Sequence, residues 1–150
     1  MNIETETVIN VNIVDVWDVL SNFKSYHQWN PYIYKVESLD EGAKNLLVSA
    51  KIMGDKEMKL QTKMMEWRLG SRFAWQGNIF NLPWLLAFSH YFYLRQVSYN
   101  ETKCIIGIEF SGVMSSYVGS RLAPYLAHSL GAMQQALKGK CEKNALTQAA

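Results

Sequence analysis

The chain has 150 residues, of which 49% are apolar and 13% aromatic, and its formal net charge is +2. This length allows one domain with a single sizeable core, and the apolar content excludes a disordered chain. The fifteen basic residues are spread out, which argues against nucleic-acid binding. The longest apolar run, residues 82–88, is too short to span a bilayer, and the N-terminus lacks the features of a signal peptide. We therefore expect a cytoplasmic protein.

The first third of the chain predicts one strand and two short helices. Residues 3–12 alternate between apolar or threonine side chains and polar ones, which is typical of a half-buried strand. A helix over 13–21 follows, with Asn12 as its N-cap and Val16, Trp17 and Leu20 on its inner face. A second helix over 23–28, with Asn22 as its cap, must end before Pro31.

From residue 32 onward the hydrophobic period changes from that of a helix to that of a strand. Short turn-type clusters containing Gly, Asn or Asp separate the alternating segments, so neighbouring strands should pair as antiparallel hairpins. We predict strands over 32–39, 45–53, 56–68, 72–78, 87–97 and 103–111.

The last periodic segment, residues 116–143, predicts a long amphipathic helix. Its apolar stripe has to be covered by the preceding strands, because residues 144–150 contain no further periodic run. Residues 145–150 are expected to fray. Pro124 lies inside the segment and should either kink the helix or separate a short first turn from it. The stripe consists of Val118, Leu122, Leu126, Ser129, Leu130, Met133, Leu137 and Cys141.

These elements predict an α+β fold in a single domain, residues 1–150. A seven-stranded antiparallel sheet has one face that needs cover, and only the last helix is long enough to supply it. Right-handed twist should curl the sheet around that helix, with the two short helices between the first and second strands.

The order of these elements resembles the START-like superfamily, also called Bet v 1-like, SRPBCC or helix-grip, and within it the bacterial polyketide cyclase/dehydrase branch. The resemblance covers nearly the whole chain and rests on six blocks: residues 16–20, 26–31, 73–77, 89–92, 109–112 and 133–138. It implies a cavity between sheet and terminal helix that takes a small apolar or amphipathic molecule, such as a lipid, isoprenoid or polyketide-like compound. One scaffold carries many activities, so the resemblance indicates the fold more sharply than the function.

The inward positions of the predicted strands and helix supply suitable walls for such a cavity. The residues themselves leave open whether these side chains line a cavity or simply interlock as a core. The candidate ligand-binding residues are Trp29 and Tyr34 near the mouth, and Phe73, Trp75, Phe88, His90, Phe92, Ile108, Phe110, Leu126, Ser129, Leu130 and Met133 inside.

His90 is the inward-facing ionisable group and the candidate catalytic residue. It would act as a general base or donate a hydrogen bond to a ligand carbonyl, or else be a core histidine bonded to backbone or to a tyrosine hydroxyl. The inward position on the adjacent strand is Ile108, and Glu109 should face solvent, so no carboxylate orients the imidazole. In a cyclase or dehydrase, Tyr26, Tyr34 or Trp75 would position the substrate.

The segment 79–86 is unusually apolar for a connection between two strands. It either folds inward and plugs the open end of the sheet, or acts as a gate or contact surface. The candidate gate residues are Phe80, Leu82, Trp84 and Leu85.

Three functions follow from these patterns. The first is binding of a small hydrophobic molecule, and the second is a cyclase or dehydrase that uses His90. The third is an interaction module that uses the 79–86 segment on a protein or membrane partner, although nothing further in the sequence supports membrane contact. No metal-ligand spacing and no cofactor motif occurs, and Cys104 and Cys141 are expected to be buried free thiols. The sequence does not fix the oligomeric state.

Overall fold

The computed structural model describes residues 1–54, 56–79 and 81–149. The strands and helices begin and end within a few residues of their predicted positions. In chain order they are β1 (Asn2–Ile9), α1 (Ile13–Leu20), the 3-10 helix η1 (Phe23–Ser25), α2 (Tyr26–Trp29), β2 (Ile33–Ser38), β3 (Asn45–Met53), β4 (Lys56–Arg68), β5 (Arg72–Asn78), β6 (Ala87–Ser98), β7 (Glu101–Ser111) and α3 (Ser115–Ala149).

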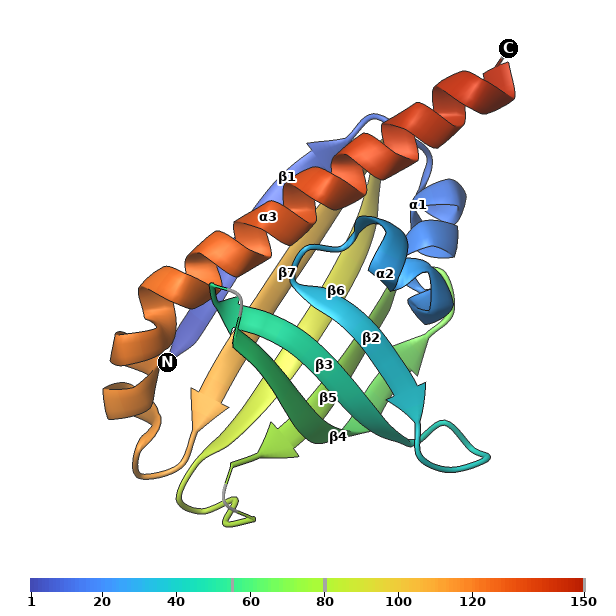
Figure 1. The fold of residues 1–150 in the computed structure, drawn as a ribbon. Helices are drawn as coiled ribbons and strands as arrows, with labels where there is room; N and C mark the ends of the chain where they lie inside the picture. The colour runs from blue at the N-terminus through green and yellow to red at the C-terminus, as the bar shows by residue number, and fades with distance from the viewer. Residues whose placement is uncertain (55, 80, 150) are drawn as a thin grey trace.

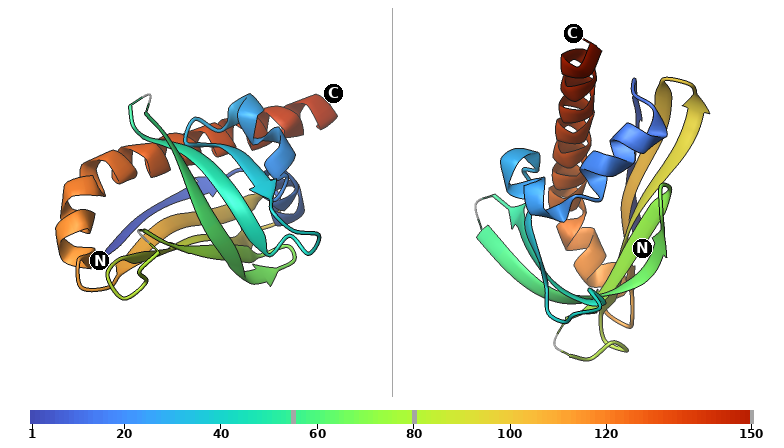
Figure 2. Two further views of the ribbon diagram at one scale, coloured as in Figure 1. Left: turned by 60° about the horizontal axis from the view of Figure 1, so that its bottom comes forward. Right: turned by 90° about the vertical axis from the view of Figure 1, so that its right-hand side faces the viewer.

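The seven strands form one antiparallel sheet in the order β1-β7-β6-β5-β4-β3-β2. Strands β2 to β7 are a meander, as short turns require, and β1 joins the sheet beside β7. The sheet curls strongly, and α3 runs along its concave side (Figures 1 and 2). The predicted fold class, a curved seven-stranded sheet that grips a C-terminal helix, is therefore confirmed.

Side chains alternate between the concave and convex faces, with one shift in β4 that matters for the interior. Along β4, Leu60, Thr62 and Met64 face inward, and a register shift follows between Met64 and Glu66. The extra residue of this bulge lets Trp67 point to the same side as Met64. The Trp67 ring consequently packs on inner-face rings, with centroids 5.3 Å from Trp17.

Helix α3 buries the predicted stripe against the sheet. Leu126, Leu130, Met133 and Leu137 are almost completely buried. The helix is continuous through Pro124 and bends in its N-terminal part (Figure 2), which is the kinked form of the two predicted alternatives. The helix extends past the predicted end at residue 143 to Ala149, through most of the 145–150 segment expected to fray, and Ala145 packs against the core.

The short helices begin as their caps dictate, with one exception. The Asn12 side chain accepts a hydrogen bond from the Asp15 backbone N–H at 3.1 Å, as predicted. The predicted cap by Asn22 is wrong, because its side chain makes no capping bond and η1 is only three residues long.

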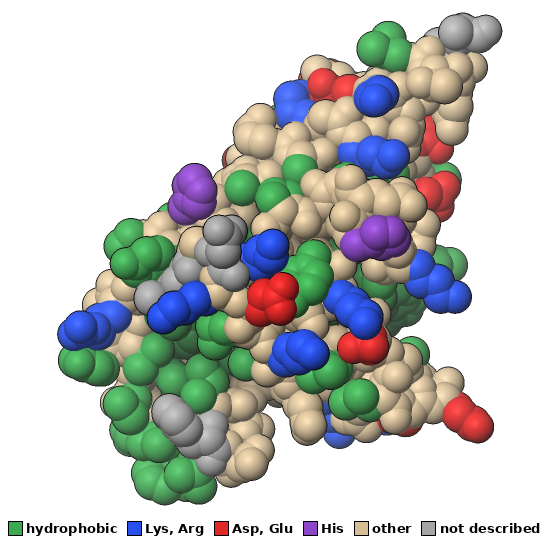
Figure 3. Space-filling view, viewed as in Figure 1, with side chains coloured by type: hydrophobic (Ala, Val, Ile, Leu, Met, Phe, Trp, Pro, Cys, Tyr) green, Lys and Arg blue, Asp and Glu red, His purple; other side chains and the backbone are tan. Residues whose placement is uncertain are grey.

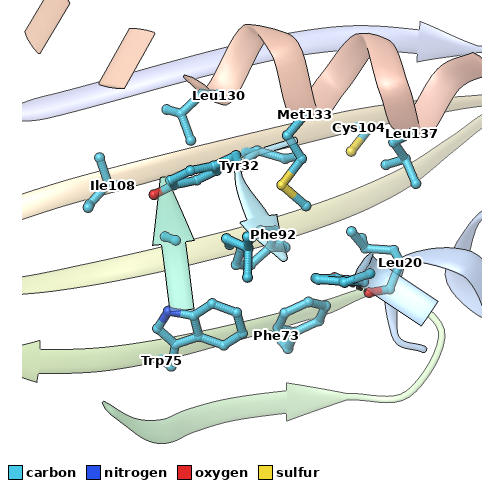
Figure 4. Packing of buried hydrophobic residues seen from close by; sticks show 14 of the residues in the cluster. Leu20, Tyr32, Phe73, Trp75, Phe92, Cys104, Ile108, Leu130, Met133 and Leu137 are labelled. Atoms are coloured by element: carbon cyan, nitrogen blue, oxygen red, sulfur yellow. Dashed lines mark hydrogen bonds between the residues drawn. The ribbon is translucent and has the colours of Figure 1, made fainter. Parts of the chain in front are cut away.

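The core is continuous from the short helices to α3. In Figure 4, Leu130, Met133 and Leu137 point from α3 toward Phe73, Trp75 and Phe92 on the strands. Cys104 and Cys141 are buried and unbridged, as expected. Burial raises the pKa of the Cys141 thiol to about 12, so it is protonated at neutral pH.

Candidate functional site

An apolar cavity lies between the sheet and the N-terminal half of α3, at the end where the β5–β6 connection also lies. Its volume is about 40 Å³, and about 510 Å³ when the space between atoms and the opening to solvent are included. Its walls are almost entirely hydrocarbon. They consist of Tyr32, Ile33, Val48, Ala50, Ile52, Met58, Leu60, Thr62, Trp75, Ile79, Phe88, His90, Ile108, Phe110, Leu122 and Leu126.

The size of this cavity decides what it holds without rearrangement. Small-molecule pockets commonly measure about 300–1,000 Å³, and one water needs roughly 10–15 Å³. A volume of about 40 Å³ thus suffices for a few water-sized groups. A cavity exists where the family resemblance implies one, but it is much smaller than a lipid-sized guest requires, and side chains fill most of the interior.

His90 and Tyr32 form a polar pair in this apolar wall. The Tyr32 hydroxyl lies 3.1 Å from His90 Nε2, and the side chains are 3% and 2% exposed. The imidazole also stacks on Phe92, with centroids 4.5 Å apart. His90 Nδ1 is buried and makes no hydrogen bond of ordinary geometry among the described residues, although the backbone of Gly107 and Tyr91 lies close enough to favour the charged ring. A hydrogen-bonding group that reached this atom would satisfy it.

Burial sets the protonation state of the pair. Removal from water lowers the pKa of His90 to about 3. The backbone of Gly107 and Tyr91 raises the pKa and offsets part of that lowering. Burial likewise raises the pKa of Tyr32 well above its usual value. Both side chains are therefore neutral at pH 7. A histidine with so low a pKa is a weak general base at neutral pH, since base catalysis works best with a pKa near the working pH.

The corner between α2 and β2 positions Tyr32 for this contact. Asn30 Oδ1 accepts hydrogen bonds from the backbone N–H groups of Tyr32 and Ile33, each at 3.0 Å. The Tyr32 carbonyl in turn accepts a 2.8 Å bond from the Lys51 N–H. The Asn30 corner is thus structural, and it also fixes the residue that contacts His90.

Six of the thirteen predicted ligand-binding residues line this cavity: Trp75, Phe88, His90, Ile108, Phe110 and Leu126. Five more lie on the inner side but are packed into the core beyond the cavity, where α3 is pressed against the sheet: Phe73, Phe92, Ser129, Leu130 and Met133. The rings of Phe73 and Phe92 stack at 4.6 Å and leave no space between them.

The two predicted mouth residues lie elsewhere. Tyr34 is on the convex face of the sheet, where Lys51 Nζ sits 5.7 Å above its ring. Trp29 packs edge-on against Tyr26 at 5.1 Å, outside the cavity lining. Tyr26 is also excluded from positioning a substrate here, because it is fully buried and donates its hydroxyl to the Leu20 carbonyl.

The residues that the sequence reasoning missed come mainly from β3 and β4, whose inner faces form a whole wall of the cavity. Their alternating pattern was visible, but which strands lie opposite α3 depends on how the sheet curls. Tyr32 was missed although it begins the predicted strand 32–39, because we expected Tyr34 to be the aromatic residue of that strand near the cavity mouth. The missed residues are Tyr32, Ile33, Val48, Ala50, Ile52, Met58, Leu60, Thr62, Ile79 and Leu122.

The β5–β6 connection turns only part of its apolar content inward. Ile79 lines the cavity and Leu86 is 1% exposed, whereas Trp84 is 64% exposed. The Val113 and Met114 N–H groups donate to the carbonyls of Trp84 and Leu85, which ties the connection to the turn before α3. The simple plug is therefore wrong for Leu82 and Trp84, which face outward. The predicted gate residue Phe80 lies outside the described residues.

An apolar surface surrounds this connection. Hydrophobic side chains gather at this end of the molecule in Figure 3, over the β5–β6 connection and the start of α3. Its exposed members include Leu82, Trp84, Val113 and Tyr117. None of the helices in the described part of the chain is both long and apolar enough to cross a membrane.

Ionisable side chains do not gather into a metal site among the described residues. No group of three or more His, Cys, Asp or Glu side chains is placed to hold an ion there. The cavity lining likewise contains no carboxylate, with Ile108 inward and Glu109 exposed.

A curved antiparallel sheet around one long helix, with a hydrocarbon-lined space between them, defines a helix-grip protein with an apolar interior. Residues 1–146 match the family described as polyketide cyclase/dehydrase and lipid transport, and the chain belongs to that family.

Three solved structures illustrate the likeness. The Zhui aromatase/cyclase from Streptomyces sp. R1128 has a TM-score of 0.76 at 15% identity, with 97% of this chain and 95% of that chain covered. A START superfamily protein from Mycobacterium smegmatis has a TM-score of 0.73 at 15% identity, with 95% and 97% covered. Ara h 8.0201 has a TM-score of 0.70 at 13% identity, with 95% and 98% covered. At these identities the likeness shows the fold alone. No curated protein sequence matches the chain.

Proposed function

We propose that this protein binds a small apolar or amphipathic molecule in the cavity between the sheet and α3. The observation that carries the proposal is the lining, an almost entirely hydrocarbon wall that holds the Tyr32–His90 pair, in which His90 Nδ1 is buried and makes no hydrogen bond of ordinary geometry among the described residues. Burying apolar ligand surface contributes roughly 25 cal/mol per Å² before ordering costs, and one hydrogen bond to the imidazole would orient the molecule.

Binding of anything larger than a few atoms requires the cavity to widen. The side chains best placed to move are Ile79 on the β5–β6 connection and Leu122 on the first part of α3, since both are only partly buried. A ligand that binds the widened form more tightly than the narrow form shifts the protein toward the widened form. The size of the shift is set by the difference between the two affinities. We therefore include in the proposal that the β5–β6 connection acts as a gate, which moves to admit the ligand.

The test combines a mass measurement with a cavity-filling variant. Native mass spectrometry of protein purified from its host reveals a co-purified molecule, and octan-1-ol serves as a defined apolar probe. Binding of octan-1-ol is followed through the ¹³C-methyl NMR signal of Met58, which lines the cavity and is assigned with Met58→Leu. Ala50→Val narrows the cavity and should weaken binding.

Ala74→Val is the matched control. It adds the same two methyl-sized groups as Ala50→Val, but on the opposite face of the sheet, away from the cavity. If neither a co-purified molecule nor a saturable Met58 shift appears, or if both valine variants bind octan-1-ol equally well, binding in this cavity is refuted.

A polyketide cyclase or dehydrase is the second candidate, and the Tyr32–His90 pair is the observation that favours it. The pair would serve as a hydrogen-bond donor to a substrate carbonyl rather than as a strong base, because the pKa of His90 is about 3. Shape would then do most of the catalytic work, by holding a reactive chain in a productive conformation. His90→Phe, which removes the donor and keeps an aromatic ring, should slow turnover of an aromatic polyketide precursor while the protein stays folded, and unchanged turnover would exclude this role.

A further inference from the structure

A second space opens at the other end of the sheet, and it is much larger than the internal cavity. This groove has a volume of about 850 Å³ and lies between η1, the β2–β3 hairpin and the end of β4. Strand β4 borders both spaces. Its residues Met58, Leu60 and Thr62 line the internal cavity, and Met64 and Trp67 line the groove. The groove is lined by Ser21, Asn22, Phe23, Lys24, Val36, Ser38, Gly42, Ala43, Lys44, Leu46, Met64 and Trp67.

The floor of the groove is apolar and partly open to solvent. Trp67 is 47% exposed although its ring contacts Phe23 and Phe73, with centroids 6.3 and 5.6 Å away. The β4 bulge aims Trp67 at this position beside Met64. A half-exposed indole next to a methionine and a phenylalanine offers a surface on which a hydrocarbon chain gains by burial.

The rim of the groove carries charge of one sign. Lys24 on η1 and Lys44 at the end of the hairpin both line it, and its lining contains no Asp or Glu. In the part of the chain described, neither lysine makes an ion pair. The hairpin carboxylate Asp40 does not line the groove, and it accepts hydrogen bonds from the Lys44 and Asn45 backbone N–H groups. The internal cavity, in contrast, has no charged lining residue.

We propose that this groove is a second binding site, for an amphipathic anion. A carboxylate or phosphate head would lie between the ammonium groups of Lys24 and Lys44, and the hydrocarbon part would lie on Trp67, Met64 and Phe23. The volume falls within the range of small-molecule pockets. The two lysines give the site its charge selectivity, because an uncharged molecule gains only the apolar contact.

The methyl groups of Met58 and Met64, both on β4, report binding in the internal cavity and in the groove separately. ¹³C-methyl NMR with octanoate and with octyl phosphate should shift the signal of Met64, assigned with Met64→Leu, in a saturable manner. Octan-1-ol should shift Met64 much less at equal concentration. The two anions distinguish a carboxylate-selective from a phosphate-selective site. Met58, in the internal cavity, reports the separate function proposed above, so one proposal can fail while the other holds.

The Lys24→Gln/Lys44→Gln double variant should weaken octanoate and octyl phosphate binding about tenfold and leave the weak octan-1-ol response at Met64 unchanged. Binding to the unmodified protein should weaken as salt is added. The Lys59→Gln/Lys63→Gln double variant is the control, since both lysines lie on the outer face of β4 and the change in net charge is the same. The proposal is overturned if neither anion shifts Met64, or if both double variants bind the anions equally.

Discussion

The Tyr32 hydroxyl and His90 Nε2 lie 3.1 Å apart inside the apolar wall of the cavity, although 58 positions separate the two residues in the chain. The contact joins the residue just before β2 to β6, across the open side of the curled sheet. It therefore exists only when the sheet has closed around its contents, and both side chains are neutral there because they are buried.

Tyr32→Phe should lower the free energy of unfolding by about 1–3 kcal/mol, because it leaves a buried imidazole nitrogen without its partner. Urea denaturation measures the change. Tyr99→Phe is the control: Tyr99 is 80% exposed, so its change should stay within about 0.5 kcal/mol. Equal effects of the two variants would show that the Tyr32–His90 bond contributes nothing to stability.

Stability should depend on pH through His90. Burial lowers its pKa from 6.5 to about 3 in the folded protein, so between these values the unfolded chain binds more protons. Stability is thus fully present above pH 6.5 and is lost as pH falls toward 3, by up to about 1.4 kcal/mol per pH unit. Urea denaturation of the unmodified protein and of His90→Gln at several pH values between 5 and 7 measures the slope.

His90→Gln should flatten that slope, because glutamine does not titrate. His128→Gln, which replaces an exposed histidine on α3, is the matched control. A slope that survives His90→Gln would mean that His90 is not the group responsible.

Gly112→Ala should destabilise the protein by about 1–3 kcal/mol and loosen the β5–β6 connection. Gly112 has φ of +100°, and an added Cβ would lie 2.6 Å from the Leu85 carbonyl oxygen. Thermal unfolding measures the loss, and hydrogen exchange should speed up at the Val113 and Met114 N–H groups, which bond to the connection.

Gly131→Ala provides the contrast to Gly112→Ala. Gly131 lies inside α3 with nothing within 4 Å of an added Cβ, so alanine there should stabilise the protein by up to about 1 kcal/mol. A neutral Gly112→Ala variant would show that this turn does not hold the connection in place.

Two substitutions on the β5–β6 connection should differ sharply in their effect. Leu86→Ala should cost about 2–5 kcal/mol of stability, because Leu86 is 1% exposed. Trp84→Ser should change stability by no more than about 0.5 kcal/mol, because the indole is 64% exposed. Guanidinium denaturation compares them, and a large loss from Trp84→Ser would show that its ring is buried in solution.

The sequence by itself predicted the elements, the fold class and part of the inner face. Hydrophobic period and turn chemistry are local properties, so the strands from β2 to β7 and the stripe on α3 could be recognised along the chain. The same locality identified Asn12 as a cap, and His90 and Ile108 as inward residues.

Only the tertiary structure decided which inward residues border free space. The curl of the sheet places β3 and β4 opposite the N-terminal half of α3, so Ala50 and Met58 line the cavity while Phe92 and Met133 are packed into the core. A one-residue bulge in β4 turned Trp67 inward. The physical reason is that side-chain direction follows from local period, whereas the gap between packed elements depends on curvature, bulges and contacts between residues far apart in the chain.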